Sequence, residues 1–239
     1  DEKPGKISDM FKALFKNDQA MTVVVSIILV YTSLNICGNL VLYFFRFDVG
    51  NEGAYSIFAA VAFAAQVIVM MVIPLLRKRF SKSRLFISGF IIQIAGFAVI
   101  LIMGFAKLYT PQSWYILCLP GILIYLGYGM LNVIMTIFLS DSVDYGEVMN
   151  GTREESVIFS MQTFTVKLAS GVAVFLAGLV VDWIHLDAAA AVQTQDTLDA
   201  LRMWMTIPSV ILLIVGIFVF KRFYKLDDAR MEEIKSKLN

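Results

Sequence analysis

The chain has 239 residues, of which 59% are hydrophobic and only 16% are charged; its formal net charge is +1 and its mean hydropathy +0.75. Soluble domains carry about 25% charged residues, so this composition excludes an ordinary soluble protein and predicts an all-α membrane protein. The near-zero net charge gives no indication of a nucleic-acid partner.

The sequence carries no motif for catalysis, for a metal or for a bound cofactor. Its two cysteines, Cys37 and Cys118, both fall in hydrophobic segments, where reduced thiols packed in the interior are expected. Zinc-ligand spacing, a glycine-rich phosphate loop and a nucleophile elbow are all absent from the sequence. We therefore expect a protein that is not an enzyme and that has no metal site or resident cofactor.

Residues 1–19 predict a cytoplasmic linker that ends in a short basic amphipathic helix. This stretch begins DEKPGKISDMFKALFKND, without an initiator Met or a signal peptide, as in the middle of a longer protein. Six apolar segments follow that are long enough to cross about 30 Å of hydrocarbon. They cover about 20–45, 54–76, 85–106, 113–139, 156–181 and 201–220. We predict a six-helix transmembrane bundle over 20–222 and a cytoplasmic tail over 223–239.

The distribution of basic residues predicts the orientation. On the side of the termini, loops and tails hold sixteen Lys and Arg residues, whereas the other side has only Arg46, Lys107 and Arg202. Positive charge collects on the cytoplasmic side of membrane proteins, so both termini are expected there. The run RKRFSKSR at 77–84 is compatible with binding to anionic lipid, although a loop that merely sets the topology is the simpler interpretation.

Three of the six segments carry polar residues at helical spacing. The first has Thr32, Asn35 and Asn39; the fourth has Tyr125, Tyr128, Asn132 and Thr136; the fifth has Ser160, Thr163, Lys167 and Ser170, with Gln162 beside them. The third and sixth segments are nearly bare of polar residues and are expected to face lipid. This pattern predicts a pathway for a polar solute between the first, fourth and fifth helices.

Lys167 is the most informative of these residues. It lies eleven residues into the fifth segment, counted from Ser156, which places its ammonium near the membrane midplane. An ionisable group there costs about 2.5–3.5 kcal/mol and usually has a partner, yet no segment has an internal Asp or Glu. We infer that its partner belongs to a second half of the protein; a structural lysine bonded to backbone carbonyls is the less favoured alternative.

The stretch DSVDYGEVMNGTREESVIFSMQTFTVK at 141–167 carries a family resemblance. It resembles the D-x-x-DYGE … R-x-E-[SG] … S-x-Q-T-x-x-x-K pattern of the melibiose-carrier-like glycoside–pentoside–hexuronide:cation symporters, a branch of the major facilitator superfamily. FKNDQ at 15–19, Asn35 and QTQDTLDALRMWMTIPS at 193–209 also agree. The resemblance spans essentially the whole chain and implies the carboxy-terminal half of a twelve-helix major facilitator fold.

The resemblance implies roles for particular residues. Asp141, Asp144 and Arg153, with Glu147 in the same stretch, match a cytoplasmic gate that closes against charges of the amino-terminal half. Lys167 matches a lysine between the sugar and cation sites. Asn132 replaces a tryptophan that faces the sugar, so Tyr128 is expected to supply the stacking surface instead. The other residues expected along the pathway are Thr163, Gln162 and Asn35.

The expected function is secondary active transport of a sugar or glycoside, coupled to Na⁺ or H⁺ and open to Li⁺, by alternating access. The expected location is the bacterial cytoplasmic (inner) membrane. The partners are the sugar, membrane lipid and an amino-terminal six-helix half, which in this family holds the cation-binding carboxylates. Two alternatives stay open: a major-facilitator transporter of an organic acid or peptide, and a membrane receptor or scaffold that does not transport.

Overall fold

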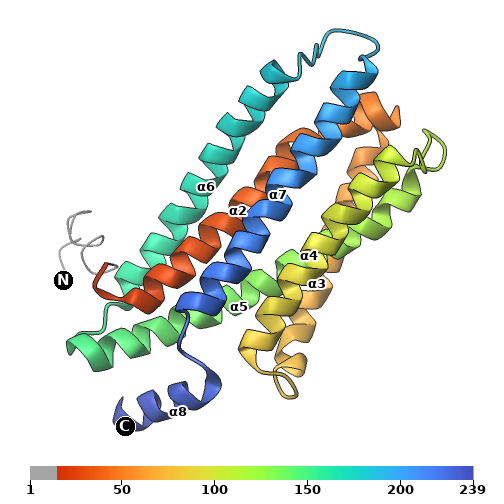
Figure 1. The fold of residues 1–239 in the computed structure, drawn as a ribbon. Coiled ribbons are helices and arrows are strands. Elements are labelled where there is room, and N and C mark those ends of the chain that lie inside the picture. The colour runs from red at the N-terminus through yellow and green to blue at the C-terminus, as the bar shows by residue number, and fades with distance from the viewer. Residues whose placement is uncertain (1–14, 239) are drawn as a thin grey trace.

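The computed structural model describes residues 15–238 as a bundle of long helices that run alternately up and down (Figure 1). The elements are α2 (Asp18–Tyr43) with a π-helical turn η1 (Phe44–Val49), α3 (Ala54–Leu76), α4 (Lys82–Phe105), a 3₁₀ turn η2 (Trp114–Leu117), α5 (Cys118–Asn150), α6 (Glu155–Trp183), α7 (Gln195–Phe223) and α8 (Asp228–Leu238). Residues 1–14 of the predicted linker lie outside the described residues. Helices α2 to α7 are long and apolar enough to cross a membrane, so the prediction of an all-α membrane protein with six spanning helices is confirmed.

The helices form two groups that do not follow chain order. Helix α2 packs against α6 and α7, and helix α5 packs against α3 and α4. Contacts of α4 with α7 and of α2 with α5 join the two groups. We call the end where α2 begins, α7 ends and α8 lies the terminal end (Figure 1); the other end is the opposite end.

Helix α5 extends well beyond the predicted span 113–139. It continues to Asn150 and ends at Gly151, whose φ of 72° is the left-handed conformation that glycine adopts most easily. No proline or glycine pair interrupts the intervening sequence, so the helix persists after the apolar run has ended. As a result Asp141, Asp144 and Glu147 lie on a rigid helix rather than in a loop.

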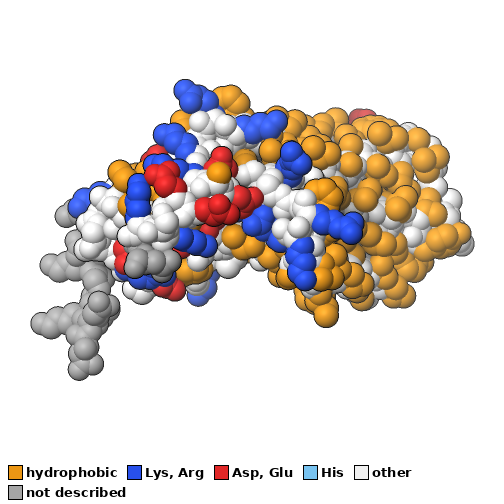
Figure 2. All heavy atoms as spheres, turned by 90° about the horizontal axis from the view of Figure 1, so that it is seen from below, with side chains coloured by type: hydrophobic (Ala, Val, Ile, Leu, Met, Phe, Trp, Pro, Cys, Tyr) orange, Lys and Arg blue, Asp and Glu red, His pale blue; other side chains and the backbone are white. Residues whose placement is uncertain are grey.

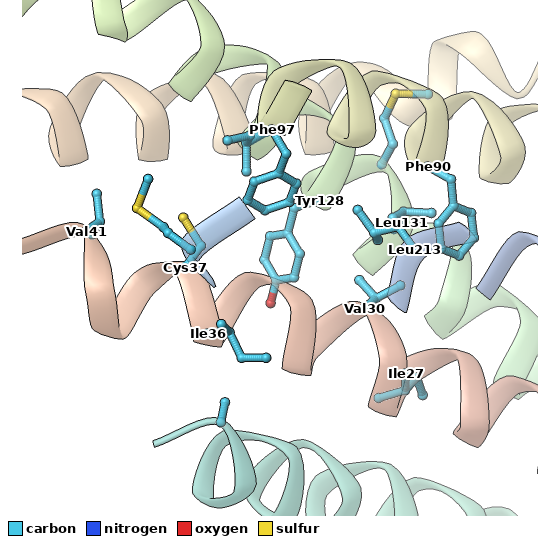
Figure 3. Close-up of a cluster of buried hydrophobic side chains, with 14 of the residues drawn as sticks. Ile27, Val30, Ile36, Cys37, Val41, Phe90, Phe97, Tyr128, Leu131 and Leu213 are labelled. Atoms are coloured by element: carbon cyan, nitrogen blue, oxygen red, sulfur yellow. The ribbon is translucent and has the colours of Figure 1, made fainter. Parts of the chain in front are cut away.

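The interior of the bundle is apolar and closely packed. Figure 3 shows the ring of Tyr128 lying between Phe97 and helix α2, with Val30 and Leu131 beside it. Gln93 in the middle of α4 and Thr206 and Ser209 in the middle of α7 are also fully buried, so the outward faces of the middle of these two helices are largely apolar, as expected for lipid contact.

A buried ion pair ties the opposite end of the bundle together. The Arg202 guanidinium on α7 binds both carboxylate oxygens of Asp48 in η1, and only 6% and 1% of the two side chains is exposed. Arg202 also contacts Asp199 at 2.5 Å, and the Tyr109 hydroxyl donates to Asp48. Burial, followed by the charge of Asp48, raises the pKa of Tyr109. This phenol therefore stays protonated and remains a donor.

Two residues of the FKNDQ motif join three helices at the terminal end. The Asn17 side chain caps α2 by accepting from the Ala20 amide and donates to the Ser142 carbonyl on α5 at 2.7 Å. Gln19 accepts from the backbone amide of Lys225, just beyond α7, at 2.8 Å. The motif therefore has a structural role, because it joins the start of α2 to the later part of α5 and to the end of α7.

We predict that Gly127→Ala destabilises the protein by about 1–3 kcal/mol. Helices α4 and α5 cross so closely that a Cβ at Gly127 would lie 2.5 Å from the Gly89 carbonyl oxygen, and backbone cannot move aside cheaply. Thermal unfolding in detergent measures the effect.

The matched control is Gly38→Ala on α2, where a Cβ would meet nothing within 4 Å. Because alanine is the better helix former, this change should stabilise the protein by up to about 1 kcal/mol. Equal shifts for the two variants would contradict the close crossing.

Candidate functional site

Polar side chains of α2 and α5 meet around Tyr31. The Asn132 amide donates to the Tyr31 hydroxyl at 2.6 Å, and the rings of Tyr31 and Tyr128 pack edge to face with centroids 5.5 Å apart. The Asn35 amide donates to the Tyr31 carbonyl at 2.7 Å. In Figure 3 the Tyr128 hydroxyl points toward α2. These four residues, which we call the Tyr31 group, combine two aromatic faces with amide and hydroxyl groups.

Tyr31 was missed in the sequence analysis. It precedes Asn35 and Asn39 by four and eight residues, so all three lie on one face of α2. Thr32, which had been assigned to that face, is buried in the bundle. The spacing could have revealed Tyr31, but an aromatic residue in an apolar segment is usually part of the core.

Helix α6 presents Lys167 on its exposed face. Its opposite face buries Ala169, Ala173 and Ala177 against α2, where small side chains allow close approach. Thr163 lies one turn before Lys167, is also exposed, and donates to the Phe159 carbonyl at 3.3 Å; Gln162, beside it, is partly buried. Within residues 15–238 no carboxylate lies within ion-pairing distance of Lys167.

Arg153 gathers three carboxylates between α5 and α6. Its Nη1 lies 3.0 Å from Asp144 and 2.8 Å from Glu147, and its Nε donates to Glu155 at 3.0 Å. These hydrogen bonds, that to Glu147 first, raise the pKa of the Arg153 guanidinium, which therefore stays charged. The Arg153 cluster fastens the end of α5 to the start of α6 and is partly exposed at the terminal end.

Asp141 lies apart from the Arg153 cluster, although the family resemblance places them in one gate. It is buried and pairs with Lys82, the first residue of α4; the side chains are 8% and 3% exposed. Lys82 also lies 4.0 Å from Asp228 on α8, which contacts Arg77 at 3.1 Å. Asp141 therefore has a partner within this chain, because α4 begins close enough to α5 to supply Lys82, and its role in a gate stays a prediction.

Lys82 could not have been singled out from the sequence, where it is one of five cations in the run 77–84. Tyr224, just beyond α7, lies near the Lys82–Asp141 pair. Its ring packs on Phe138 and Phe220 at centroid distances of 4.3 and 4.8 Å. Burial, and then the charges of Asp141 and other acids nearby, raise the pKa of Tyr224. The phenol therefore adds no negative charge here.

Helix α8 packs on the same part of α5. Leu226, Met231 and Ile234 form a small apolar cluster with Tyr145 and Val148. Together with the Arg77–Asp228 contact, this cluster fixes α8 across the ends of α4 and α5.

Comparison with known proteins agrees with this architecture. Residues 1–228 match the family described as MFS/sugar transport protein. The chain belongs to this family. The resemblance of 141–167 to sugar symporters of the major facilitator superfamily is thereby confirmed at the level of the family.

Several curated relatives are similar along nearly the whole chain. The isoprimeverose transporter of Lactiplantibacillus pentosus is 26% identical over 92% of this chain and 44% of its own length. The raffinose carrier protein of Pediococcus pentosaceus is 23% identical over 97% of this chain and 35% of its own length. The lactose permease of Lactobacillus helveticus is 24% identical over 97% of this chain and 36% of its own length. The chain therefore spans less than half the length of each of these relatives.

We predict that Lys82→Met lowers the free energy of unfolding by about 3–5 kcal/mol, because it leaves the Asp141 carboxylate buried without its partner. The double variant Lys82→Met/Asp141→Leu should regain most of this loss, since it removes both charges together. Chemical or thermal unfolding of the purified protein gives the double-mutant cycle.

Lys78→Met, an exposed lysine of the same loop, is the control and should change stability by less than about 0.5 kcal/mol. A double variant as unstable as Lys82→Met would show that the lysine acts through packing rather than through its charge.

Proposed function

We propose that this chain forms the carboxy-terminal half of a sugar symporter that works by alternating access in a bacterial cytoplasmic membrane. The observation that carries the proposal is a family match along residues 1–228 together with a mid-span lysine that has no carboxylate partner in the described bundle. The names of the relatives, a raffinose carrier, an isoprimeverose transporter and a lactose permease, support a sugar or glycoside as the solute.

A second six-helix half is proposed to pack against α3 and α6. In the most apolar stretch of each of these helices only 28% of residues are buried, against 61% in α2. Their outward faces are apolar and include Phe63 and Met71 on α3 and Phe175 on α6. The relatives are more than twice as long as the part that this chain matches, which is compatible with a second half of similar size. The exposed face of α6, which carries Lys167, would then face the other bundle.

The solute is proposed to bind between the Tyr31 group and the exposed face of α6. The aromatic rings of Tyr31 and Tyr128 offer apolar surfaces for a sugar ring, and the amide of Asn132 offers hydrogen bonds to its hydroxyls. Lys167 would pair with carboxylates of the other half that also bind the coupling ion, Na⁺ or H⁺. Sugar and ion would then act on one electrostatic network, as coupled transport requires.

The Arg153 cluster is proposed to act as part of the cytoplasmic gate, with the terminal end facing the cytoplasm. Asp144 and Glu147 are 16% and 32% exposed, so charges of the other half can reach them. Asp141 would contribute indirectly, since its pairing with Lys82 fixes the end of α5 on which the cluster is built. Contacts present in only one state bias the equilibrium between inward-open and outward-open forms.

We predict that Lys167→Ala reduces concentrative uptake of labelled glycosides by at least about tenfold, a factor that corresponds to about 1.4 kcal/mol. The reason is that carboxylates of the other half lose their cation. Uptake by cells expressing the complete protein, with and without Na⁺, is the measurement.

Lys221→Ala, at the exposed end of α7, is the control and should leave uptake unchanged at equal membrane abundance. Full concentrative uptake by Lys167→Ala would refute the coupling role. If unlabelled sugars do not compete with wild-type uptake, the solute is an organic acid or peptide. If the wild-type protein shows no uptake at all, the protein is a receptor or scaffold that does not transport.

We predict that Asp144→Asn shifts the population toward the inward-open form by roughly two- to fivefold, because Arg153 loses one of its carboxylates while the gate loses a charge. Alkylation of single cysteines placed on the two sides of the membrane reports the populations.

The control is Glu233→Gln on α8, which removes an exposed carboxylate that pairs with Lys237 and Arg230 and not with Arg153. Unchanged accessibility in Asp144→Asn would remove this residue from the gate.

A further inference from the structure

The loop between α3 and α4 lines an open pocket of about 510 Å³ at the terminal end, together with parts of α5 and α8. Five cations line it: Arg77, Lys78, Arg79, Lys82 and Lys235. Three carboxylates also line it, those of Asp141, Asp228 and Glu232. Figure 2 shows Lys and Arg side chains spread around a smaller group of acids on this end of the molecule. We call this cavity the basic pocket; its cations outnumber its carboxylates.

Two of the five cations are already neutralised inside the protein. Lys82 pairs with Asp141, and Arg77 contacts Asp228 at 3.1 Å. Within the described residues, Lys78, Arg79 and Lys235 have no carboxylate within 4.0 Å. Glu232 is the one remaining carboxylate among the described residues that line the pocket. These three cations therefore leave an excess of positive charge on the loop and on the facing part of α8.

Hydrogen bonds fix the backbone of the loop that carries Lys78 and Arg79. The Phe80 amide donates to the Leu76 carbonyl at 2.9 Å, and Arg77 donates to the Phe80 carbonyl at 3.2 Å. The turn therefore limits the backbone entropy lost when an anion binds to Lys78 and Arg79, although their exposed side chains still have to be ordered.

The position of the basic pocket at the ends of two spanning helices indicates which kind of ligand it can bind. It lies where two membrane-spanning helices end, and Phe80, 45% exposed, projects beside Lys78 and Arg79. Aromatic side chains next to basic ones are typical of the headgroup region of a membrane. Arg84 is also exposed, on the first turn of α4, whose outward face is apolar with Ile91 and Ile102 exposed. A ligand there needs an anionic head and an apolar tail.

We propose that the basic pocket binds the phosphate headgroup of an anionic phospholipid, with Lys78, Arg79 and Lys235 as its charged contacts. The cavity volume lies within the range of sites for small ligands. Because Lys235 belongs to α8 and the other two cations to the α3–α4 loop, the lipid would hold α8 against the bundle. This site is independent of the transport activity proposed above.

The test is direct lipid binding by the complete protein, measured by native mass spectrometry and by association with vesicles of phosphatidylcholine with or without phosphatidylglycerol. The double variant Lys78→Gln/Arg79→Gln should lose phosphatidylglycerol affinity by about tenfold or more. Lys235→Gln should lose a smaller but measurable part, and phosphatidylcholine binding should stay unchanged in both.

The control is Lys221→Gln/Arg222→Gln, which removes one lysine and one arginine, adjacent in sequence and exposed, from the end of α7. It should change phosphatidylglycerol affinity less than twofold. Equal losses in the two double variants would mean diffuse attraction and overturn the site. Competition by inorganic phosphate or glycerol phosphate at equal strength would show a free anion as ligand, which also overturns it.

A third outcome separates the lipid from a protein occupant. If Lys78→Gln/Arg79→Gln leaves lipid binding intact but weakens association of the two halves, the pocket receives the other half of the transporter and the proposal fails. Since neither readout uses transport, failure of the lipid site and failure of the symporter function remain distinguishable.

Discussion

The cost of an uncompensated charge in hydrocarbon governs the arrangement of this bundle. Both buried ion pairs, Lys82–Asp141 and Asp48–Arg202, lie near helix ends, and each is formed between residues far apart in the chain. Opposite charges have to meet before either is buried, because a single charge left behind costs several kcal/mol. Each pair therefore fixes the position of one element against another at its end of the bundle: α4 against α5 at the terminal end, and η1 against α7 at the opposite end.

Helix α5 connects the Lys82–Asp141 pair to the candidate site. Its first third crosses α4 at the Gly89–Gly127 contact, its buried face carries Tyr128, and its second half holds Asp141. The Arg153 cluster is built on the last turns of the same helix. A movement of α5 would therefore displace residues of the Tyr31 group and of the proposed gate together. That continuity offers a physical route by which solute and gate could be coupled.

Lys167 is the exception to the pairing rule, and the exception is informative. The same bundle that neutralises Lys82 and Arg202 internally leaves Lys167 on an exposed helix face. Small residues on the opposite face of α6 hold the helix tightly to α2, so the exposed orientation follows from packing. A second bundle with carboxylates facing α6 would complete the pairing that the physical rule demands.

The sequence by itself determined the number of spanning helices, their approximate positions, the family and the unusual status of Lys167. Long apolar segments and a midplane cation are local properties, and the spacing of DYGE, Arg153 and Lys167 is a one-dimensional pattern. Only the tertiary structure decided which charges meet. Lys82 looks like any other cation of a basic loop, Asp48 and Arg202 like residues at helix ends, and Tyr31 like a core aromatic residue. Their partners lie 59, 154 and 101 residues away, and no local signal reports which helices will pack side by side.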